Sequence, residues 1–290
     1  MSLCATKKGI LYAFLGFNCF TLSDVCVKWL GMENGYSVIT ILFWVYLTVL
    51  MICTLFAIPQ GFKKKLGTRK PLIHITRGGL MLLISGCAVT AFSNGMSLAT
   101  LYTIIFLSPA ITAIAAIPVY KERVSKKSWQ IILLGFAGVI VAFHNDISFF
   151  HTQIFYALGA LVIGVTINML SRPIDKRDSV LTLPFYPAAI IVPSLFLYMH
   201  GQIPLPDIEH IPVFLLSGII QFFAIIGVVQ GFRIAPFAKV APTQYVQMVF
   251  GLVMGYYIFG DFPGMWMLVG AGMIISSGLL LIAQEKFKTK

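Results

Sequence analysis

The sequence predicts an all-α integral membrane protein, with ten transmembrane helices arranged as two inverted five-helix repeats and both termini in the cytoplasm. Three observations predict this fold class. The 290 residues are 58% hydrophobic and 11% charged, with a mean hydropathy of +0.90, whereas soluble domains carry about 25% charged residues. The apolar residues form runs near the roughly 20 residues that a helix needs to cross a bilayer. The basic residues gather between alternate runs, as they do in cytoplasmic connections.

Composition and charge exclude several other classes of protein. No polar stretch is long enough for a separate soluble domain, which excludes a cytoplasmic enzyme and a secreted module. The net charge of +11 does not indicate nucleic-acid binding, because the basic residues lie in short clusters between apolar runs. Five cysteines is an odd number, and all but Cys4 lie inside apolar runs, so no disulfide framework is expected. Lys7 and Lys8 precede the first run without a cleavage site after it, so this run is expected to be retained as a span.

Each apolar run predicts one membrane-spanning helix. The ten runs are 9–31, 36–59, 73–93, 99–120, 128–144, 152–171, 179–199, 212–234, 238–260 and 263–283. The runs are continuous and do not alternate between apolar and polar residues, which favours helices over a membrane barrel. Short connections predict that neighbouring helices are antiparallel.

The distribution of charge predicts the orientation. With the N-terminus in the cytoplasm, every Lys and Arg except Lys28 falls in an internal segment. The outer connections instead carry the acidic residues Glu33, Asp146, Asp207, Glu209 and Asp261. So one-sided a distribution predicts an even number of spans with both termini inside.

The second half of the chain repeats the layout of the first. Segment 93–124 corresponds to segment 229–262, about half the chain later, and each holds a helix, a short break and a second helix. Five spans per repeat is an odd number, so the two repeats, 1–146 and 147–290, must have opposite orientations. Inverted repeats are typical of secondary transporters that alternate access around a site near the membrane midplane.

Several stretches resemble a known family. They are SDVCVKWL (23–30), HITRGGL (74–80), the segment 97–129, GFAGVIV (135–141) and the segment 238–263. On these, the chain is identified as a member of the drug/metabolite transporter superfamily, EamA type, over nearly its whole length. In one departure, Val45 stands where many relatives place an arginine, so no anion-binding role can be carried over from that position.

Polar and aromatic side chains within the spans are the candidates for substrate binding, because intramembrane polar groups usually face a cavity or a partner helix. They are Asn18, Asp24, Trp44, Tyr102, Ser108, Thr112, Asn168, Gln221, Gln244 and Tyr245. Taken singly, each more often makes an interhelical hydrogen bond or packs in the core. Taken together, in the resembled fold they would line one cavity between the repeats.

Asp24 is the only acid within a predicted span, and it is therefore the candidate for a proton-coupling carboxylate. It lies four residues before Lys28, a spacing that suits an ion pair on one helix face. The alternative role for Asp24 is thus a self-neutralised pair that anchors the helix. The sequence leaves both roles open.

The motifs that the sequence lacks narrow the function further. Without a P-loop motif or a large cytoplasmic segment, the chain cannot hydrolyse ATP by itself. No nucleophile and base lie within a span at a spacing that suits a membrane enzyme, so no enzymatic activity is expected. The five histidines have no ligand spacing supported by Cys or acidic residues, so neither a metal site nor another cofactor is expected.

We therefore predict a secondary active transporter of a small organic metabolite, located in a bacterial cytoplasmic (inner) membrane and working by alternating access. The resemblance implies an amino acid, a nucleobase, a vitamin or S-adenosylmethionine. Segments 71–78 and 23–30 resemble carriers of S-adenosylmethionine, which favours this compound. The direction of transport is left open, and protons are a further partner if Asp24 titrates.

Two further expectations concern partners. Besides the substrate and membrane lipid, a second copy of the chain is a candidate partner, because Gly135 and Gly270 suit either packing within the scaffold or a homodimer contact. The alternative function is a non-transporting membrane scaffold or accessory subunit. In a scaffold, the polar groups of the spans would pair with one another and leave no cavity.

Overall fold

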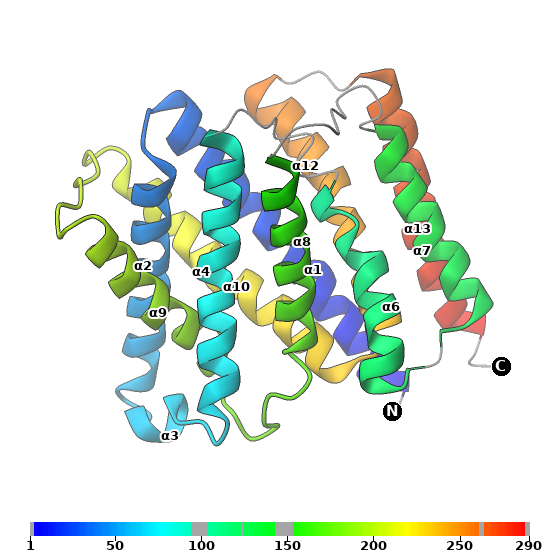
Figure 1. The fold of residues 1–290 in the computed structure, drawn as a ribbon, viewed down its shortest axis with the longest axis horizontal. Coiled ribbons are helices and arrows are strands. Elements are labelled where there is room, and N and C mark those ends of the chain that lie inside the picture. Colours follow the sequence, from blue (N-terminus) through cyan, green and yellow to red (C-terminus); the bar gives the residue numbers. More distant parts are fainter. Residues whose placement is uncertain (1–2, 94–103, 123, 143–152, 261–263, 288–290) are drawn as a thin grey trace.

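The computed structural model describes residues 3–93, 104–122, 124–142, 153–260 and 264–287, and in these ranges the chain is helical without strands (Figure 1). The first half holds α1 (Leu3–Lys28) with a π-helical continuation (Trp29–Glu33), α2 (Val38–Ala57), α3 (Phe62–Leu66), α4 (Pro71–Ser93), α6 (Ser108–Tyr120) and α7 (Lys126–Ala142). The second half holds α8 (Gln153–Met169), α9 (Thr182–Tyr198), α10 (Ile211–Ile234), α11 (Phe237–Val240), α12 (Gln244–Phe259) and α13 (Met265–Phe287).

The helices agree with the apolar runs of the sequence. Within the described ranges, an α-helix overlaps each of the ten predicted spans. Four helices are long and apolar enough to cross a membrane, namely α1 with its continuation, α2, α4 and α10. α6, α8, α9 and α13 contain shorter apolar stretches. The all-helical class is thus confirmed, while the number of spans and their orientation stay predictions.

Two of the predicted spans are interrupted helices. In the first half, α6 begins at Ser108 and carries Pro109 in its first turn. In the second half, α11 ends at Val240, a 3₁₀ turn contains Pro242, and α12 begins at Gln244. Proline lacks the N–H group that a continuous helix needs, and its ring clashes with the preceding turn. The fourth and ninth spans are therefore broken at corresponding places in the two halves.

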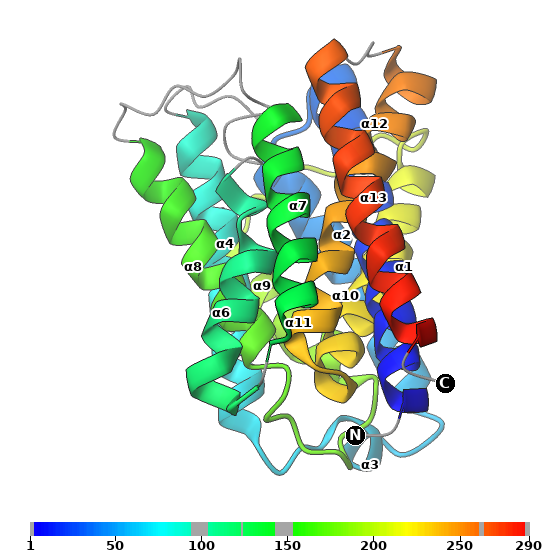
Figure 2. The same ribbon diagram turned by 90° about the vertical axis from the view of Figure 1, so that its right-hand side faces the viewer.

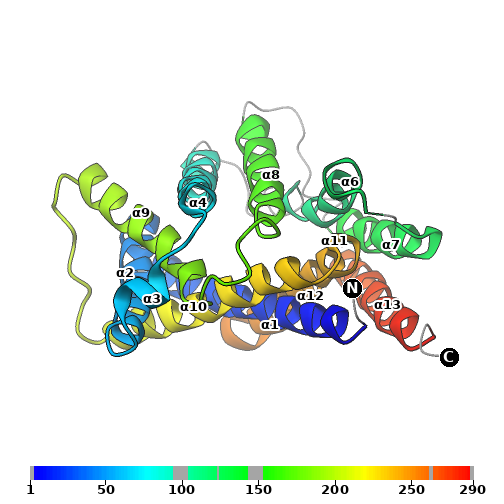
Figure 3. The same cartoon turned by 90° about the horizontal axis from the view of Figure 1, so that it is seen from below.

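The helix contacts between the two halves repeat when the halves are exchanged. α1 packs on α10 as α8 packs on α4, and α1 packs on α12 as α8 packs on α6. α2 contacts α10 as α9 contacts α4, while α7 packs on α13 (Figure 2). Seen from below, α4 and α8 lie on one side of the bundle and α1 and α10 on the other (Figure 3). The space between these two sides is where the helices of both halves meet.

Glycines allow the closest helix crossings. A Cβ atom added to Gly227 of α10 would lie 2.6 Å from the Cα atom of Gly16 in α1. Between α7 and α13, a Cβ atom on Gly138 would lie 2.8 Å from the carbonyl oxygen of Gly270, and the ring of Tyr245 covers Gly135. Gly135 and Gly270 therefore both pack within this chain. Of the two roles that the sequence allows for them, this is the packing role. A homodimer stays a prediction.

Candidate functional site: a central cavity

A cavity of about 250 Å³ lies between the two sides of the bundle, which approaches the size of small-molecule sites, roughly 300–1,000 Å³. Helices of both halves line it, and its wall is mostly apolar, with Phe17 and Phe20 of α1 among the lining side chains. The polar lining residues are Tyr46, Arg77, Ser85, Ser108, Asn168, Ser171 and Gln244. Among the described lining residues there is no aspartate or glutamate. The wall is therefore apolar, with a few polar groups and one positive charge.

That charge is Arg77, which lies inside α4 and is fully buried. Its Nε and Nη1 atoms have no hydrogen-bond partner among the residues that the structure describes. An uncompensated buried charge costs several kcal/mol, about 3–5 where a buried pair has been broken. A guanidinium presents its N–H donors in a planar fork that matches a carboxylate. Arg77 is therefore suited to hold an anionic group inside the cavity.

The two interrupted helices contribute one polar residue each. Ser108 is the first residue of α6 and Gln244 is the first residue of α12, and both line the cavity. Oε1 of Gln244 is buried without a hydrogen-bond partner in the described part of the chain. Asn168 of α8 lies in the same wall. Three residues predicted from the sequence thus meet at one cavity.

Gln221 lies one layer behind the wall. Its Nε2 atom donates a hydrogen bond of 3.4 Å to the hydroxyl oxygen of Tyr46, and Tyr46 lines the cavity from α2. Gln221 is buried and therefore orients the phenol of Tyr46 without lining the cavity itself.

The remaining predicted residues lie outside the lining. Trp44 Nε1 donates to the carbonyl of Pro204, 3.0 Å away, beyond the end of α9. Asn18 Nδ2 donates to the Phe14 carbonyl of its own helix at 2.7 Å. Thr112 and Tyr245 are buried in packing contacts. Tyr102 lies outside the described residues.

Asp24 also lies away from the cavity. Its side chain is exposed, and it interacts with the side chain of Gln247 in α12 and electrostatically with Tyr46 of the cavity wall. The Nζ atom of Lys28 lies 4.1 Å from the ring centroid of Phe259. The coupling role of Asp24 stays a prediction, and the structure gives it no place in the cavity wall.

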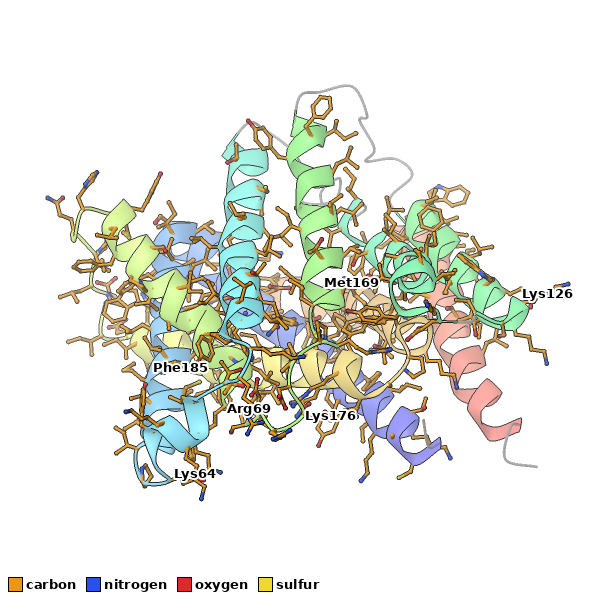
Figure 4. All side chains as sticks on the ribbon, turned by 60° about the horizontal axis from the view of Figure 1, so that its bottom comes forward. Lys64, Arg69, Lys126, Met169, Lys176 and Phe185 are labelled. Carbon is orange, nitrogen blue, oxygen red and sulfur yellow. The ribbon has the colours of Figure 1, made fainter. Side chains whose placement is uncertain are left out.

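Figure 4 shows Lys64, Arg69 and Lys176 at the end of the bundle where α1 begins and α13 ends, which we refer to as the basic end. A polar network closes this end. An ion pair joins Arg172 Nη1 and Glu122 Oε1 at 2.8 Å. Arg172 Nη2 also donates to the Ala235 carbonyl at 2.7 Å, and its Cζ atom lies 4.4 Å from the ring centroid of Phe237. The backbone N–H of Phe237 donates to Glu122 at 3.2 Å. These contacts tie α6 and α8 to α10 and α11.

The connection from α8 to α9 adds further links. Lys70 Nζ donates to the Pro173 carbonyl at 2.8 Å, and Arg233 donates to the carbonyl of Asp175. The pKa of the Asp175 carboxyl is lowered from its ordinary value, first by a hydrogen bond from the backbone N–H of Arg177, at 2.9 Å, and then by nearby cations. Asp175 therefore stays ionised at neutral pH. The links join α4 and α10 across the basic end of the cavity.

We expect Glu122→Gln to lower the free energy of unfolding by about 1–3 kcal/mol. The amide still accepts from Phe237, but Arg172 loses its counter-charge while it stays largely buried. Denaturant titration in detergent micelles measures the change, with Glu209→Gln, an exposed acid beyond the other end of the bundle, as the control. Equal stability of the two variants would show that the ion pair does not hold the basic end closed.

Arg77 is the residue that the sequence interpretation missed. It was counted with the basic residues of an internal connection, although it lies inside the predicted span 73–93. The sequence does carry a signal for Arg77, because a charged residue within an apolar run is more often a functional group than part of a connection. The same interpretation passed over Tyr46, Ser85 and Ser171, whose types are too common in helices to single out.

Comparisons with known proteins agree with this arrangement. The model of the EamA-like transporter family matches residues 7–144 and again residues 151–283. The S-adenosylmethionine uptake transporter of Rickettsia prowazekii (strain Madrid E) is 27% identical over 283 residues, 96% of this chain and 93% of the relative. A riboflavin transporter of Rhizobium johnstonii (strain DSM 114642 / LMG 32736 / 3841) is 23% identical and covers 96% of this chain and 91% of its own length.

One solved structure matches the whole of both chains with a TM-score of 0.80 at 14% identity, which shows the shared fold. The family match is the stronger finding for function, because it covers most of the chain and occurs once in each half. Apolar helices in both halves, a cavity between them and this match lead to one conclusion. The chain is a multi-pass membrane protein that belongs to the EamA-like transporter family.

Proposed function

We propose that this chain is a secondary active transporter of a small metabolite that carries a carboxylate, and that it is not an enzyme. The observation that carries the proposal is the buried guanidinium of Arg77, which faces a cavity between the two halves and has no partner for Nε and Nη1 among the described residues. A carboxylate in the cavity would supply the missing counter-charge. Transport then consists of exposing this site alternately to the two sides of the membrane.

The architecture supports alternating access by ten spans in two inverted repeats, residues 1–146 and 147–290. The pairings of α1, α2 and their neighbours recur for α8 and α9. The breaks at Pro109 and Pro242 occupy corresponding places, as expected of discontinuous helices around a midplane site. The clustered positive charge at the basic end supports placing both termini in the cytoplasm of a bacterial cell.

S-adenosylmethionine is the first candidate substrate. It combines an amino-acid carboxylate with a sulfonium cation and a flat adenine ring. Arg77 suits the carboxylate, and the aromatic rings of Phe17, Phe20 and Tyr46 suit the cation and the adenine. Relatives named S-adenosylmethionine uptake transporters support this choice. Riboflavin, the substrate in the names of other relatives, has no carboxylate to pair with Arg77.

The scaffold alternative fits the structure less well. A scaffold would pair its polar groups across the helices, whereas Arg77 and Gln244 both keep buried polar atoms without partners at one cavity, within the residues described. Unsatisfied groups of this kind are costly, and a ligand in the cavity would lower the cost for these two residues. The observation therefore favours transport.

Uptake into liposomes tests the proposal. We expect saturable uptake of labelled S-adenosylmethionine by the purified protein. Unlabelled decarboxylated S-adenosylmethionine should compete at least tenfold more weakly than the parent compound, because it leaves Arg77 unpaired. Labelled riboflavin, amino acids and nucleobases form the rest of the panel. Equal competition by the decarboxylated compound would contradict the role of Arg77, and no uptake of any member by folded protein would contradict the proposed function.

A further inference from the structure

A second buried group lies one helical turn from Arg77. His74 of α4 is fully buried, and its Nε2 atom lies 3.0 Å from Oδ2 of Asp178, which is also buried. Thr68 donates a second hydrogen bond of 2.7 Å to the same oxygen. The ring of His74 stacks on Tyr186, with the ring centroids 4.9 Å apart. The pair is thus fixed in place from α4, from α9 and from the connections that precede these two helices.

The geometry defines where a proton can bind. With Asp178 as a carboxylate, neutral His74 donates its Nε2–H to that carboxylate, and Nδ1 is then the nitrogen without a proton. Nδ1 is buried and has no hydrogen-bond partner among the residues that the structure describes. It is therefore free to accept a proton, and the resulting imidazolium would be stabilised by Asp178.

Charged groups around His74 set the conditions for that step. Arg77 lies three residues further along α4 on the same helix face, and Arg233 approaches from α10, where it also donates to the Asp178 carbonyl at 3.4 Å. Burial opposes a positive charge on His74 most strongly, Asp178 favours it, and the two cations add to the opposition. Tyr186 is the titratable group on α9 that faces the ring. The charge on Arg77 therefore bears directly on whether His74 can hold a proton.

We propose that His74, paired with Asp178, binds the proton that couples transport to a pH gradient. This inference rests on the proposed function. A substrate carboxylate at Arg77 neutralises the cation next to His74, so that His74 then accepts a proton at Nδ1 from water that reaches the site when it opens to one side of the membrane. For this reason the proton and the substrate bind together. They also leave together, and the proton returns to water on the other side of the membrane. One proton accompanies each substrate, and such coupling is typically about 5–150-fold in affinity.

Asp24 is the competing candidate for proton coupling. Asp24 is exposed, and neither Asp24 nor His74 is among the lining residues of the cavity. His74 lies within one helical turn of Arg77 on α4, whereas Asp24 lies on a different helix, α1. The same assay therefore decides between the two residues.

The test counts protons. S-adenosylmethionine is added to the purified protein in weakly buffered detergent solution, and a pH indicator reports proton uptake. We expect about one proton per ligand bound by the unmodified chain, and binding that tightens by up to about tenfold per pH unit as the pH falls. His74→Gln keeps a donor towards Asp178 but has no titratable nitrogen. It should bind and exchange substrate, take up no proton and fail to accumulate substrate along a pH gradient.

Two further variants serve as a second test and as a control. Asp178→Asn removes the carboxylate that stabilises the imidazolium and should lower proton uptake at least tenfold, which provides a second test if His74→Gln does not fold. His200→Gln alters an exposed histidine and should change nothing. Binding without proton uptake by the unmodified chain would overturn the inference and leave the proposed function intact. So would proton uptake that survives in His74→Gln and is lost in Asp24→Asn. Absence of binding by every compound of the panel would overturn the proposed function itself.

Discussion

Arg77→Met is expected to weaken substrate binding strongly and, at the same time, to stabilise the protein. Methionine retains an unbranched apolar stem like that of arginine but removes a charge that is fully buried without partners for Nε and Nη1 in the described structure. Loss of the pair with a substrate carboxylate should weaken binding by on the order of 10²–10³-fold. Replacing buried ionic groups with apolar residues often raises the free energy of unfolding by about 1–4 kcal/mol. Binding and melting should therefore change in opposite directions.

Calorimetric titration with S-adenosylmethionine and thermal melting in detergent measure the two effects on the same preparation. Arg77→Lys serves as the conservative variant: it retains the charge but loses the planar fork, so binding should be intermediate. Arg69→Met alters an exposed arginine at the basic end and should affect neither quantity. A lower melting temperature together with unchanged binding would mean that Arg77 is a structural residue and would remove the observation on which the proposed function rests.

Most of the fold could be predicted from the sequence because bilayer thickness and loop charge leave few alternatives. Each apolar run contains a helix in the described residues, with ends that differ by a few residues in most cases. The larger differences occur in the runs 99–120 and 238–260, which Pro109 and Pro242 interrupt. Local chemistry accounts for both breaks, since proline cannot continue the hydrogen bonding of a helix.

The site was only partly predictable, because the sequence does not reveal how a membrane helix is rotated about its axis. α10 is apolar on all sides, so no polar stripe indicates that Gln221 turns towards Tyr46. Rotation and depth are determined by tertiary contacts such as the approach of Gly16 to Gly227. Ser108 and Gln244 could be found because they are polar residues within predicted spans. Arg77 was missed because the positive-inside rule assigns an arginine near a span end to the cytoplasm.

Gly227→Val is expected to prevent folding. A Cβ atom at this position would lie 2.6 Å from the Cα atom of Gly16 and 2.7 Å from the carbonyl oxygen of Tyr12. These are backbone atoms, which cannot move aside as a side chain can, so α1 and α10 would have to separate along their length. The cost should exceed about 4 kcal/mol, the upper range for single substitutions. Yield and monodispersity in gel filtration measure the loss.

Gly272→Val is the matched control, because a Cβ atom on this exposed glycine of α13 meets nothing within 4 Å. Monodisperse Gly227→Val protein with an unchanged melting temperature would contradict the close crossing.

The milder Gly227→Ala connects packing to function. Phe17 and Val228 both line the cavity, and they are the immediate neighbours of Gly16 and Gly227. A small separation of α1 and α10 would therefore displace two residues of the wall. Substrate affinity should fall in Gly227→Ala even where folded protein is recovered, because the crossing that holds the two helices together also sets the width of the site.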